Sequence, residues 1–269
     1  MCAVAVQPAG ARRRAARRVA SCAACGLLLA TGACGPDRRA RGPEGVPTRS
    51  LVTEIGRSRG GQPLLLEVFD GGGETVLIFG GIHGNEAGSA ALVHRLVAHL
   101  RAEPAAWRGR TVAVVAEANP DGLLRGTRGN AAGVDLNRNF PAQNWRPPRG
   151  SRGGGPGATA GSEPETQALL MLLTQLRPAR VLAVHVITRG RECNNYDGPA
   201  EALARALGRH NGYPVRAAIG YPTPGSFGSW AGVDQGIPVI TLELPAGVGV
   251  DALWEANREA LLTFIAGGS

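Results

Sequence analysis

A histidine and a glutamate three positions apart form the most chemically suggestive pattern in the chain. They occur in GGIHGNE at 80–86, directly after an apolar run that predicts a buried strand. Ligands of open α/β sheets gather at such strand ends. His83 from the loop and Glu86 from the first turn of a following helix can reach one ion together. The alternative is an ordinary polar loop whose acid is stabilised by the helix dipole.

A second histidine strengthens the metal-site interpretation. His185 follows the apolar run 181–184. It therefore lies at the end of a predicted strand, as His83 does. Two imidazoles and the Glu86 carboxylate make the His₂Glu set of a catalytic zinc site, which leaves a fourth position open for water. This set favours one Zn²⁺ over other divalent ions. Three further histidines lie on predicted helices without such partners and are expected at the surface: His94, His99 and His210.

Glu243 ends another apolar run, PVITLE at 238–243. A carboxylate at the end of a buried strand loses hydration, and this loss raises its pKa toward the range useful for a general base. We therefore expect Glu243 to be the catalytic base. The alternative is a carboxylate that points to solvent.

The segment from 119 to about 161 concentrates Asn, Arg, Gly and Pro without a helical or strand period. It contains NPDG at 119–122, Arg125, Arg128 and GVDLNRNFP at 133–141. A structureless stretch of this length inside a compact domain is usually functional. Arginine forks suit carboxylates and oxyanions. A solvated charged loop is the alternative.

Short apolar runs alternate with helical spacing along the rest of the chain, and a turn at 70–73 predicts a hairpin between the first two runs. The predicted strands are 64–69, 75–79, 111–116, 180–184 and 238–243. The predicted helices are 86–100, 162–176 (opened by a capping box of Ser162 and Glu165), 199–207 and 251–265. The alternation predicts a single α/β domain with a mixed, mostly parallel sheet flanked by helices on both faces.

The 269 residues, 43% of them hydrophobic, are enough for one such domain with a sizeable core. The net charge of +8 is concentrated near the N-terminus and gives little support for nucleic-acid binding. Arginines at 12–18 precede an uncharged run at 19–33 that is too short for a transmembrane helix but typical of a signal peptide. The run ends in TGAC, so Cys34 is a candidate for lipidation, with ordinary signal-peptidase cleavage as the alternative.

These features predict a signal peptide at 1–33, a linker rich in Pro, Gly and Arg at 34–50, and a folded domain at 51–269. The protein is expected to be exported, either as a periplasmic protein or as a membrane-anchored lipoprotein. Four of the 5 cysteines lie in or at the end of the signal segment, so only Cys193 and Cys34 remain after cleavage. No disulfide framework is expected in the domain.

The motifs HxxE, NPDG and DLNRNF, the later histidine and the strand-end glutamate resemble, in this order, the zinc carboxypeptidase family (the carboxypeptidase A-like metallopeptidases) from about Gly56 onward. Within that family the chain is similar to the bacterial murein peptide amidases. This similarity rests on IGRS at 55–58, NYDGPA at 195–200, Tyr221 and TPGSFGSW at 223–230. Those enzymes cleave the bond between γ-D-glutamate and meso-diaminopimelate in cell-wall peptides.

The resemblance implies a zinc peptidase or amidase domain at 51–269 and one role for each matching residue. His83, Glu86 and His185 would hold one zinc ion, and Glu243 would activate the attacking water and protonate the leaving amine. The other implied roles are orientation of His83 by Asp135, oxyanion stabilisation by Arg125, and substrate binding by Asn137, Arg138 and Tyr221. The implied substrate is a cell-wall peptide in which the scissile amide adjoins a residue with a free carboxylate.

Two stretches depart from the family pattern. Larger carboxypeptidases carry a tyrosine just before the catalytic strand, and its absence from 231–234 favours the short amidase branch. The stretch VITRGREC at 186–193 replaces an expected short Pro-containing loop, so Arg189 and Arg191 are either ligands for a second carboxylate or exposed charges. Asp197 is expected to pair with a substrate ammonium, and an Asp-Gly turn is the alternative.

Three functions remain open from the sequence. The first is hydrolysis of the γ-D-glutamyl–diaminopimelate bond, and the second is a zinc carboxypeptidase or deacylase that acts on another carboxylate-bearing amide. The third is a non-catalytic lipoprotein that serves as a binding module. Intact Glu243 and Arg125 argue against the third, because a degenerate site would be expected to have lost one of them.

Overall fold

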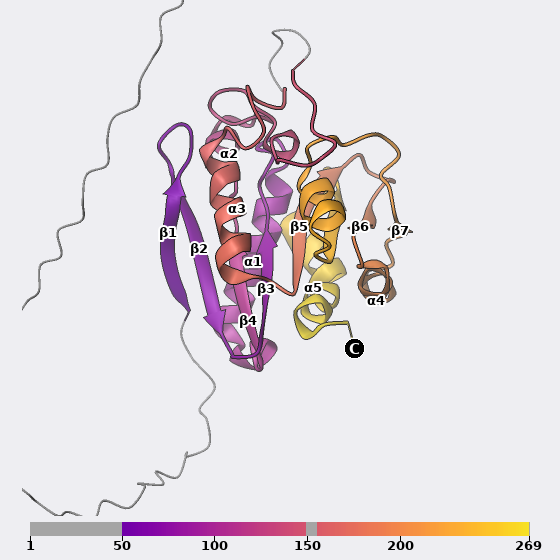
Figure 1. The fold of residues 1–269 in the computed structure, drawn as a ribbon. Helices are drawn as coiled ribbons and strands as arrows, with labels where there is room; N and C mark the ends of the chain where they lie inside the picture. Colours follow the sequence, from indigo (N-terminus) through magenta and orange to yellow (C-terminus); the bar gives the residue numbers. More distant parts are fainter. Residues whose placement is uncertain (1–49, 149–154, 269) are drawn as a thin grey trace, which may run out of the picture. The chain divides into compact units, whose positions relative to one another are not determined.

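A computed structural model describes residues 50–148 and 155–268 (Figure 1). The predicted signal peptide at 1–33, the lipidation site Cys34 and the linker up to residue 49 lie outside the described residues. Within the described ranges, no helix is both long and apolar enough to cross a bilayer.

One eight-stranded sheet forms the centre of the domain, in the order β1-β2-β4-β3-β5-β8-β6-β7. The four central strands β4, β3, β5 and β8 run parallel to one another, and antiparallel pairings join β2 to β4 and β6 to β8. The strands are β1 (Leu51–Arg57), β2 (Pro63–Asp70), β3 (Glu74–Phe79), β4 (Arg110–Val115), β5 (Arg180–Ile187), β6 (Cys193–Asp197), β7 (Val215–Arg216) and β8 (Val239–Pro245). The prediction of a mixed, mostly parallel sheet is confirmed.

Helices cover both faces of the sheet (Figure 1). Side chains alternate along β3, so that Val76 and Ile78 pack with the helices on one face, while Leu77 and Phe79 pack with α3 on the other. The first face is covered by α1 (Ala87–Ala102), α4 (Glu201–Asn211) and α5 (Val250–Ala266), and the second by α3 (Pro164–Leu176). Because both faces are covered, the central strands consist mostly of apolar residues, which is why the sequence revealed them.

The predicted hairpin between β2 and β3 is wrong, because β4 lies between these strands. The true antiparallel partner of β2 on its other side is β1, which the sequence analysis missed. Most residues of β1 are exposed, so the strand carries no hydrophobic alternation that a pattern search can detect. The short strands β6 and β7 were missed as well, and β6 has the polar sequence CNNYD.

The capping box predicted for α3 is also wrong. The Oγ of Ser162 donates to the Glu163 carboxylate, and Glu165 accepts a hydrogen bond of 2.8 Å from the backbone N–H of Arg59. The helix begins at Pro164, whose fixed φ suits a first helical position. Glu165 therefore ties α3 to the turn between β1 and β2.

The carboxyl ends of β3, β5 and β8 lie at one edge of the sheet because these strands are parallel. The described part of the segment predicted as structureless contributes residues to the same edge and contains the short helices α2 (Pro120–Arg125) and η2 (Leu136–Arg138). A further short helix, η3 (Gly228–Asp234), precedes β8 and has a π-helical hydrogen-bond pattern. The remaining helical turn, η1 (Pro104–Trp107), follows α1.

Candidate metal centre and active site

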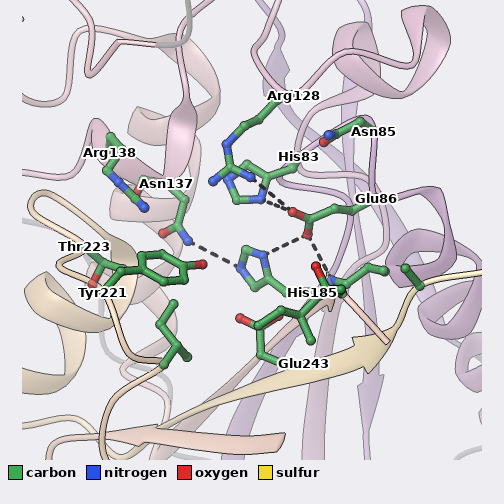
Figure 2. A pocket seen from close by; sticks show the side chains of 15 residues that line it. His83, Asn85, Glu86, Arg128, Asn137, Arg138, His185, Tyr221, Thr223 and Glu243 are labelled. Carbon is green, nitrogen blue, oxygen red and sulfur yellow. Dashed lines mark hydrogen bonds and ion pairs between the residues drawn. The ribbon is translucent and has the colours of Figure 1, made fainter. Parts of the chain in front are cut away.

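The side chains of His83, Glu86 and His185 converge at this edge (Figure 2). One potential ligand atom from each lies within 4.8 Å of the others. His83 Nδ1 is 2.7 Å from Glu86 Oε1, and His185 Nδ1 is 3.1 Å from Glu86 Oε2. The three residues predicted as metal ligands are therefore brought together from two different strand ends.

Local backbone contacts fix the HxxE segment. Glu86 is the N-cap residue of α1, and its carbonyl accepts from the Oγ of Ser89, whose Oγ also accepts from the N–H of Gly81. Gly84 lies against the backbone of α2, where an added Cβ would approach Gly122 C to 1.8 Å. Only glycine fits at position 84, because any side chain would push the histidine loop away from α2.

The hydrogen-bond partner of the His83 ring leaves the nitrogen that faces Glu86 free for a metal. Asp135 Oδ1 lies 3.0 Å from His83 Nε2, so this nitrogen carries the proton and donates, and Nδ1 keeps its lone pair. Both histidines are almost fully buried, at 2% and 4% exposed. Two imidazole nitrogens and a carboxylate at such separations fit a tetrahedral Zn²⁺ with one open position.

The acids of this cluster are all paired with positive or polar partners. Burial alone would raise the pKa of Glu86, but hydrogen bonds from His185 and His83 outweigh it and hold the pKa well below its usual range. The pKa of Asp135 is likewise held low, because the His83 hydrogen bond and the Arg128 charge outweigh burial. Both carboxylates are therefore ionised at neutral pH and give the cluster the negative charge that a dication requires.

Glu243 lies beside His185, its direct neighbour in the β5–β8 register, and is 5% exposed. Burial raises the pKa of this carboxyl, and the nearby Glu86 raises it further, against the lowering effect of His185. Its carboxylate has no side-chain hydrogen bond within the part of the chain that the structure describes. The structure thus places the predicted base at the edge of the ligand cluster, with its proton-accepting atoms free.

A cavity of about 350 Å³ opens above these residues and is lined by Asn137, Arg138 and Tyr221 (Figure 2). Asn137 Oδ1 accepts from the backbone N–H of Phe227 at 2.9 Å, which turns its NH₂ group toward the cavity. Arg138 donates from one terminal nitrogen to the carbonyl of Asn137 at 2.7 Å. Its remaining donors are available to a ligand. Three of the four residues predicted to contact the substrate therefore line one cavity, and Asp197 does not.

The structure does not bring Arg125 to the cavity. Arg125 is the last residue of α2 and is exposed, and Gly126 then reverses the chain with a φ of 65°. The arginine that lines the cavity is Arg128, which donates to Asp135 Oδ2 at 2.8 Å and to Glu86 Oε1 at 3.3 Å. The sequence contained both arginines but no signal for where α2 would end.

The NPDG motif has a structural role. Asn119 caps α2 by accepting from the N–H of Gly122 at 2.9 Å, and its Nδ2 donates to the carbonyls of Ile82 and Arg128. Asp121 accepts from the N–H of Gly60 at 2.7 Å. The motif therefore ties α2, the histidine loop and Arg128 to one another.

Tyr221 lines the cavity, whereas residues 231–234 belong to η3 and none of them lines it. Tyr221 precedes η3, and Figure 2 shows its hydroxyl pointing toward His185. Burial raises its pKa, and the Glu243 charge adds to this.

The predictions around the 186–193 stretch have mixed outcomes. Arg189 is exposed and lies outside the cavity lining, while Ile187 and Thr188 line the cavity. Arg191 is exposed and donates to the carbonyl of Ile219 at 3.0 Å, so it braces the loop that carries Tyr221. Cys193 is buried, and burial raises the pKa of its thiol to about 11, which makes it a poor nucleophile.

The predicted surface histidines differ in their environments. His94 is exposed and lies 2.8 Å from Glu117 Oε1, and His210 is exposed on α4. His99 is half-buried and packs against the ring of Trp254. None of the three lines the cavity.

Comparison with known proteins places this site in a family context. Residues 44–189 match the family model described as zinc carboxypeptidase, a range that contains His83, Glu86 and His185. Murein peptide amidase A of Escherichia coli (strain K12) is 38% identical over 183 residues, which cover 64% of this chain and 72% of that protein. The protein of the same name from Vibrio campbellii is 35% identical over 202 residues, covering 70% of this chain and 76% of the relative.

Solved structures give the same result for the fold. The crystal structure of murein-tripeptide amidase from Escherichia coli O157 matches with a TM-score of 0.66 and 34% identity, over 80% of this chain and 91% of that one. Bovine thrombin-activatable fibrinolysis inhibitor matches with a TM-score of 0.68 at 19% identity, over 80% of this chain and 88% of that one. The second likeness concerns the fold alone.

Proposed function

Because the chain belongs to the zinc carboxypeptidase family, we propose that it binds one Zn²⁺ through His83, Glu86 and His185 and hydrolyses an amide next to a free carboxylate. The observation that carries this proposal is the position of Glu243. Its buried carboxylate, which has no side-chain hydrogen bond among the described residues, lies beside the three-ligand cluster and lines the cavity. This is the arrangement that water-mediated amide hydrolysis requires.

When bound in such a site, zinc lowers the pKa of a water molecule and polarises the scissile carbonyl. Glu243 takes the proton from the attacking water and delivers it to the leaving nitrogen. A raised pKa suits both steps, because the carboxylate must accept a proton readily and then release it to a basic amine.

We assign oxyanion stabilisation to Arg128 in place of Arg125. Its guanidinium lines the cavity and contacts both Glu86 and Asp135, so its charge is fixed beside the metal ligands. A preorganised positive charge at this position stabilises the negative charge that develops on the scissile carbonyl oxygen.

We assign recognition of the free carboxylate to Asn137 and Arg138. The amide group of Asn137 and the free donors of Arg138 face the same cavity from η2. An arginine fork and an amide suit the planar, two-oxygen shape of a carboxylate. Recognition of this group fixes the scissile amide above Glu243 and His185.

We propose that the substrate is a murein peptide, cleaved between γ-D-glutamate and meso-diaminopimelate. Two relatives named murein peptide amidase A, at 38% and 35% identity, support this substrate class. The site agrees with it chemically, since the leaving diaminopimelate has a free carboxylate beside the scissile nitrogen.

The proposal is tested with purified protein, zinc analysis and one tripeptide. L-Ala-γ-D-Glu-meso-diaminopimelate should release diaminopimelate in the presence of about one zinc per chain, and a chelator should stop the reaction until zinc is restored. A peptide with an ordinary α-linkage serves as the control. Zinc-loaded protein that leaves the tripeptide intact would refute the substrate, and protein that stays metal-free when offered zinc would refute the mechanism.

We also propose that the protein is exported, on the arginines and apolar run of residues 12–33, and that Cys34 is lipidated. Mass spectrometry of the mature N-terminus tests both points. A lipid-modified Cys34 supports the proposal, and an intact chain that starts at Met1 contradicts it.

A further inference from the structure

Arg128 and Asp135 are the two ends of one short, closed loop. Arg128 Nε donates to Asp135 Oδ2 at 2.8 Å, so the ends of the loop meet beside the metal cluster. Between them, the N–H of Asn130 donates to the carbonyl of Val134 at 3.0 Å, and the N–H of Gly133 donates to the carbonyl of Asn130 at 2.9 Å. The positions of both ends therefore depend on how this loop is held.

Two glycines allow the loop to close tightly. A Cβ added at Gly129 would lie 2.6 Å from Gly133 C and 2.8 Å from Gly133 O. Gly133 has a φ of 75°, a left-handed conformation that glycine adopts without strain. The two sides of the loop are thus in backbone contact, and a displacement of one side moves the other.

The buried side chain of Asn130 holds the loop from inside and from outside. It is 3% exposed, and its Oδ1 accepts from the N–H groups of Ala132 and Val134 at 3.0 and 3.1 Å. Its Nδ2 donates to Glu163 Oε2 at 2.8 Å and to Glu165 Oε2 at 3.1 Å. One amide therefore ties the loop to two carboxylates outside it.

These two carboxylates, Glu163 and Glu165, form a buried acid pair at the start of α3. Glu163 is the N-cap residue, is 4% exposed, and accepts from Ser162 Oγ at 2.8 Å. Glu165 is 1% exposed and accepts from the N–H of Arg59, and burial raises its pKa against the lowering effect of these hydrogen bonds. Neither acid lines the cavity. Because buried carboxylates need donors, the acid pair holds the Asn130 amide firmly.

We propose that Asn130 is a positioning residue, which fixes the Arg128 guanidinium and the Asp135 carboxylate beside the metal cluster by anchoring their loop to the acid pair of α3. This inference rests on the proposed function and adds to it a residue that lies outside the cavity lining. Loss of the anchor should slow the chemical step and leave substrate binding unchanged, because Asn137 and Arg138 are held by other contacts.

Asn130→Asp tests this role, because it removes the donor to the acid pair and keeps an acceptor for the loop. At saturating zinc, kcat on L-Ala-γ-D-Glu-meso-diaminopimelate should fall about 10- to 100-fold, the effect of a small displacement of a catalytic group, and KM should stay near its native value. In an Arg128→Ala background the same substitution should lower kcat by only about 2- to 3-fold more, because the charge that it displaces is already absent.

Asn257→Asp is the matched control. Asn257 is 0% exposed on α5, and its Nδ2 donates to the carbonyl of Leu253 at 2.9 Å. The same chemical change at this buried amide should lower stability, while kcat per folded, zinc-loaded molecule stays native. A second variant, Glu165→Gln, removes one charged acceptor of the anchor and should lower kcat by about 3- to 10-fold at unchanged KM.

A native kcat in folded Asn130→Asp, or additive losses in the double variant, would assign Asn130 a purely structural role and overturn the inference. If Asn130→Asp does not fold, Glu165→Gln decides, and a native kcat in that variant overturns the inference. In each of these cases turnover by the native protein leaves the proposed function intact. A native, zinc-loaded protein that leaves the tripeptide uncleaved contradicts the proposed function itself, and the inference with it.

Discussion

Four acids in and around the cavity fall into two pairs with opposite electrostatic states. Glu86 and Asp135 are paired with histidines and with Arg128, and their pKa values are held low. Glu243 and Asp197 have no such partners among the described residues, and burial raises their pKa values. The four carboxylates are contributed by β6, β8, the start of α1 and the segment before η2.

The difference separates two tasks. Paired acids stay ionised over a wide pH range, which suits ligands and supports of a divalent cation. Burial raises the pKa of unpaired acids, which suits a base that must accept a proton. Substitutions that neutralise one acid at a time should therefore give different defects for the paired acids and for the unpaired acids.

Glu243→Gln and Glu86→Gln make the same chemical change in an unpaired acid and in a paired acid. Glu243→Gln should lower kcat about 10³-fold, within the range of general-base contributions, while zinc content stays near that of the native protein. Glu86→Gln should lose zinc and activity together. Elemental analysis and turnover of the diaminopimelate tripeptide measure both. Loss of zinc in Glu243→Gln would mean that Glu243 supports metal binding as Glu86 does, and would contradict its assignment as the base.

Arg128→Ala and Arg125→Ala test which of the two arginines acts beside the paired acids Glu86 and Asp135. Removal of Arg128 should lower kcat by about 100-fold, because a fixed charge at the developing oxyanion is lost. Removal of the exposed Arg125 should leave kcat and KM near native values. Steady-state kinetics at saturating zinc provide the measurement. Equal activities of the two variants would remove Arg128 from the site.

These arginines also show where sequence reasoning reached its limit. The positions of His83, His185 and Glu243 were predictable, because parallel apolar runs must end at one edge of the sheet. The choice between Arg125 and Arg128 depended on the end of α2, which is fixed by the cap at Asn119 and the left-handed Gly126. A six-residue helix has too few residues to show a helical period.

Long-range pairing was similarly hidden from the sequence. The turn after β2 predicted a local hairpin, but β2 pairs with β4 and β1 instead. The exposed strand β1 and the polar strand β6 lack the alternation that identifies a half-buried strand. Asp197 on β6 was predicted as a substrate contact, and its place in the lining of a pocket of about 30 Å³ beside His185 and Glu243 became visible only with the structure.

Asp135→Asn tests a residue that orients the metal ligand His83 and is not itself a ligand. The amide that replaces the carboxylate would accept from His83 more weakly and would lose the charge pairing with Arg128. Zinc affinity should fall by about 10- to 100-fold, as is typical for loss of a group that orients a histidine ligand. Competition with a chelator measures the change. Unchanged affinity would mean that the buried position of His83 is sufficient to orient the ring.

Asp197→Asn should stabilise the metal-free protein. The folded-state pKa of about 6 lies above the ordinary value of 3.8, so the folded protein binds more protons than the unfolded chain between these values. The native protein therefore loses stability as pH rises from about 4 to 6, and the Asn variant does not. Two pKa units correspond to about 3 kcal/mol, and partial exposure reduces this to about 1–2 kcal/mol. Urea unfolding in the presence of chelator should give a more stable variant at pH 8 and equal stabilities near pH 4. A variant that is less stable at pH 8 would mean that the carboxylate has a stabilising partner in the fold and is not left unpaired for a ligand.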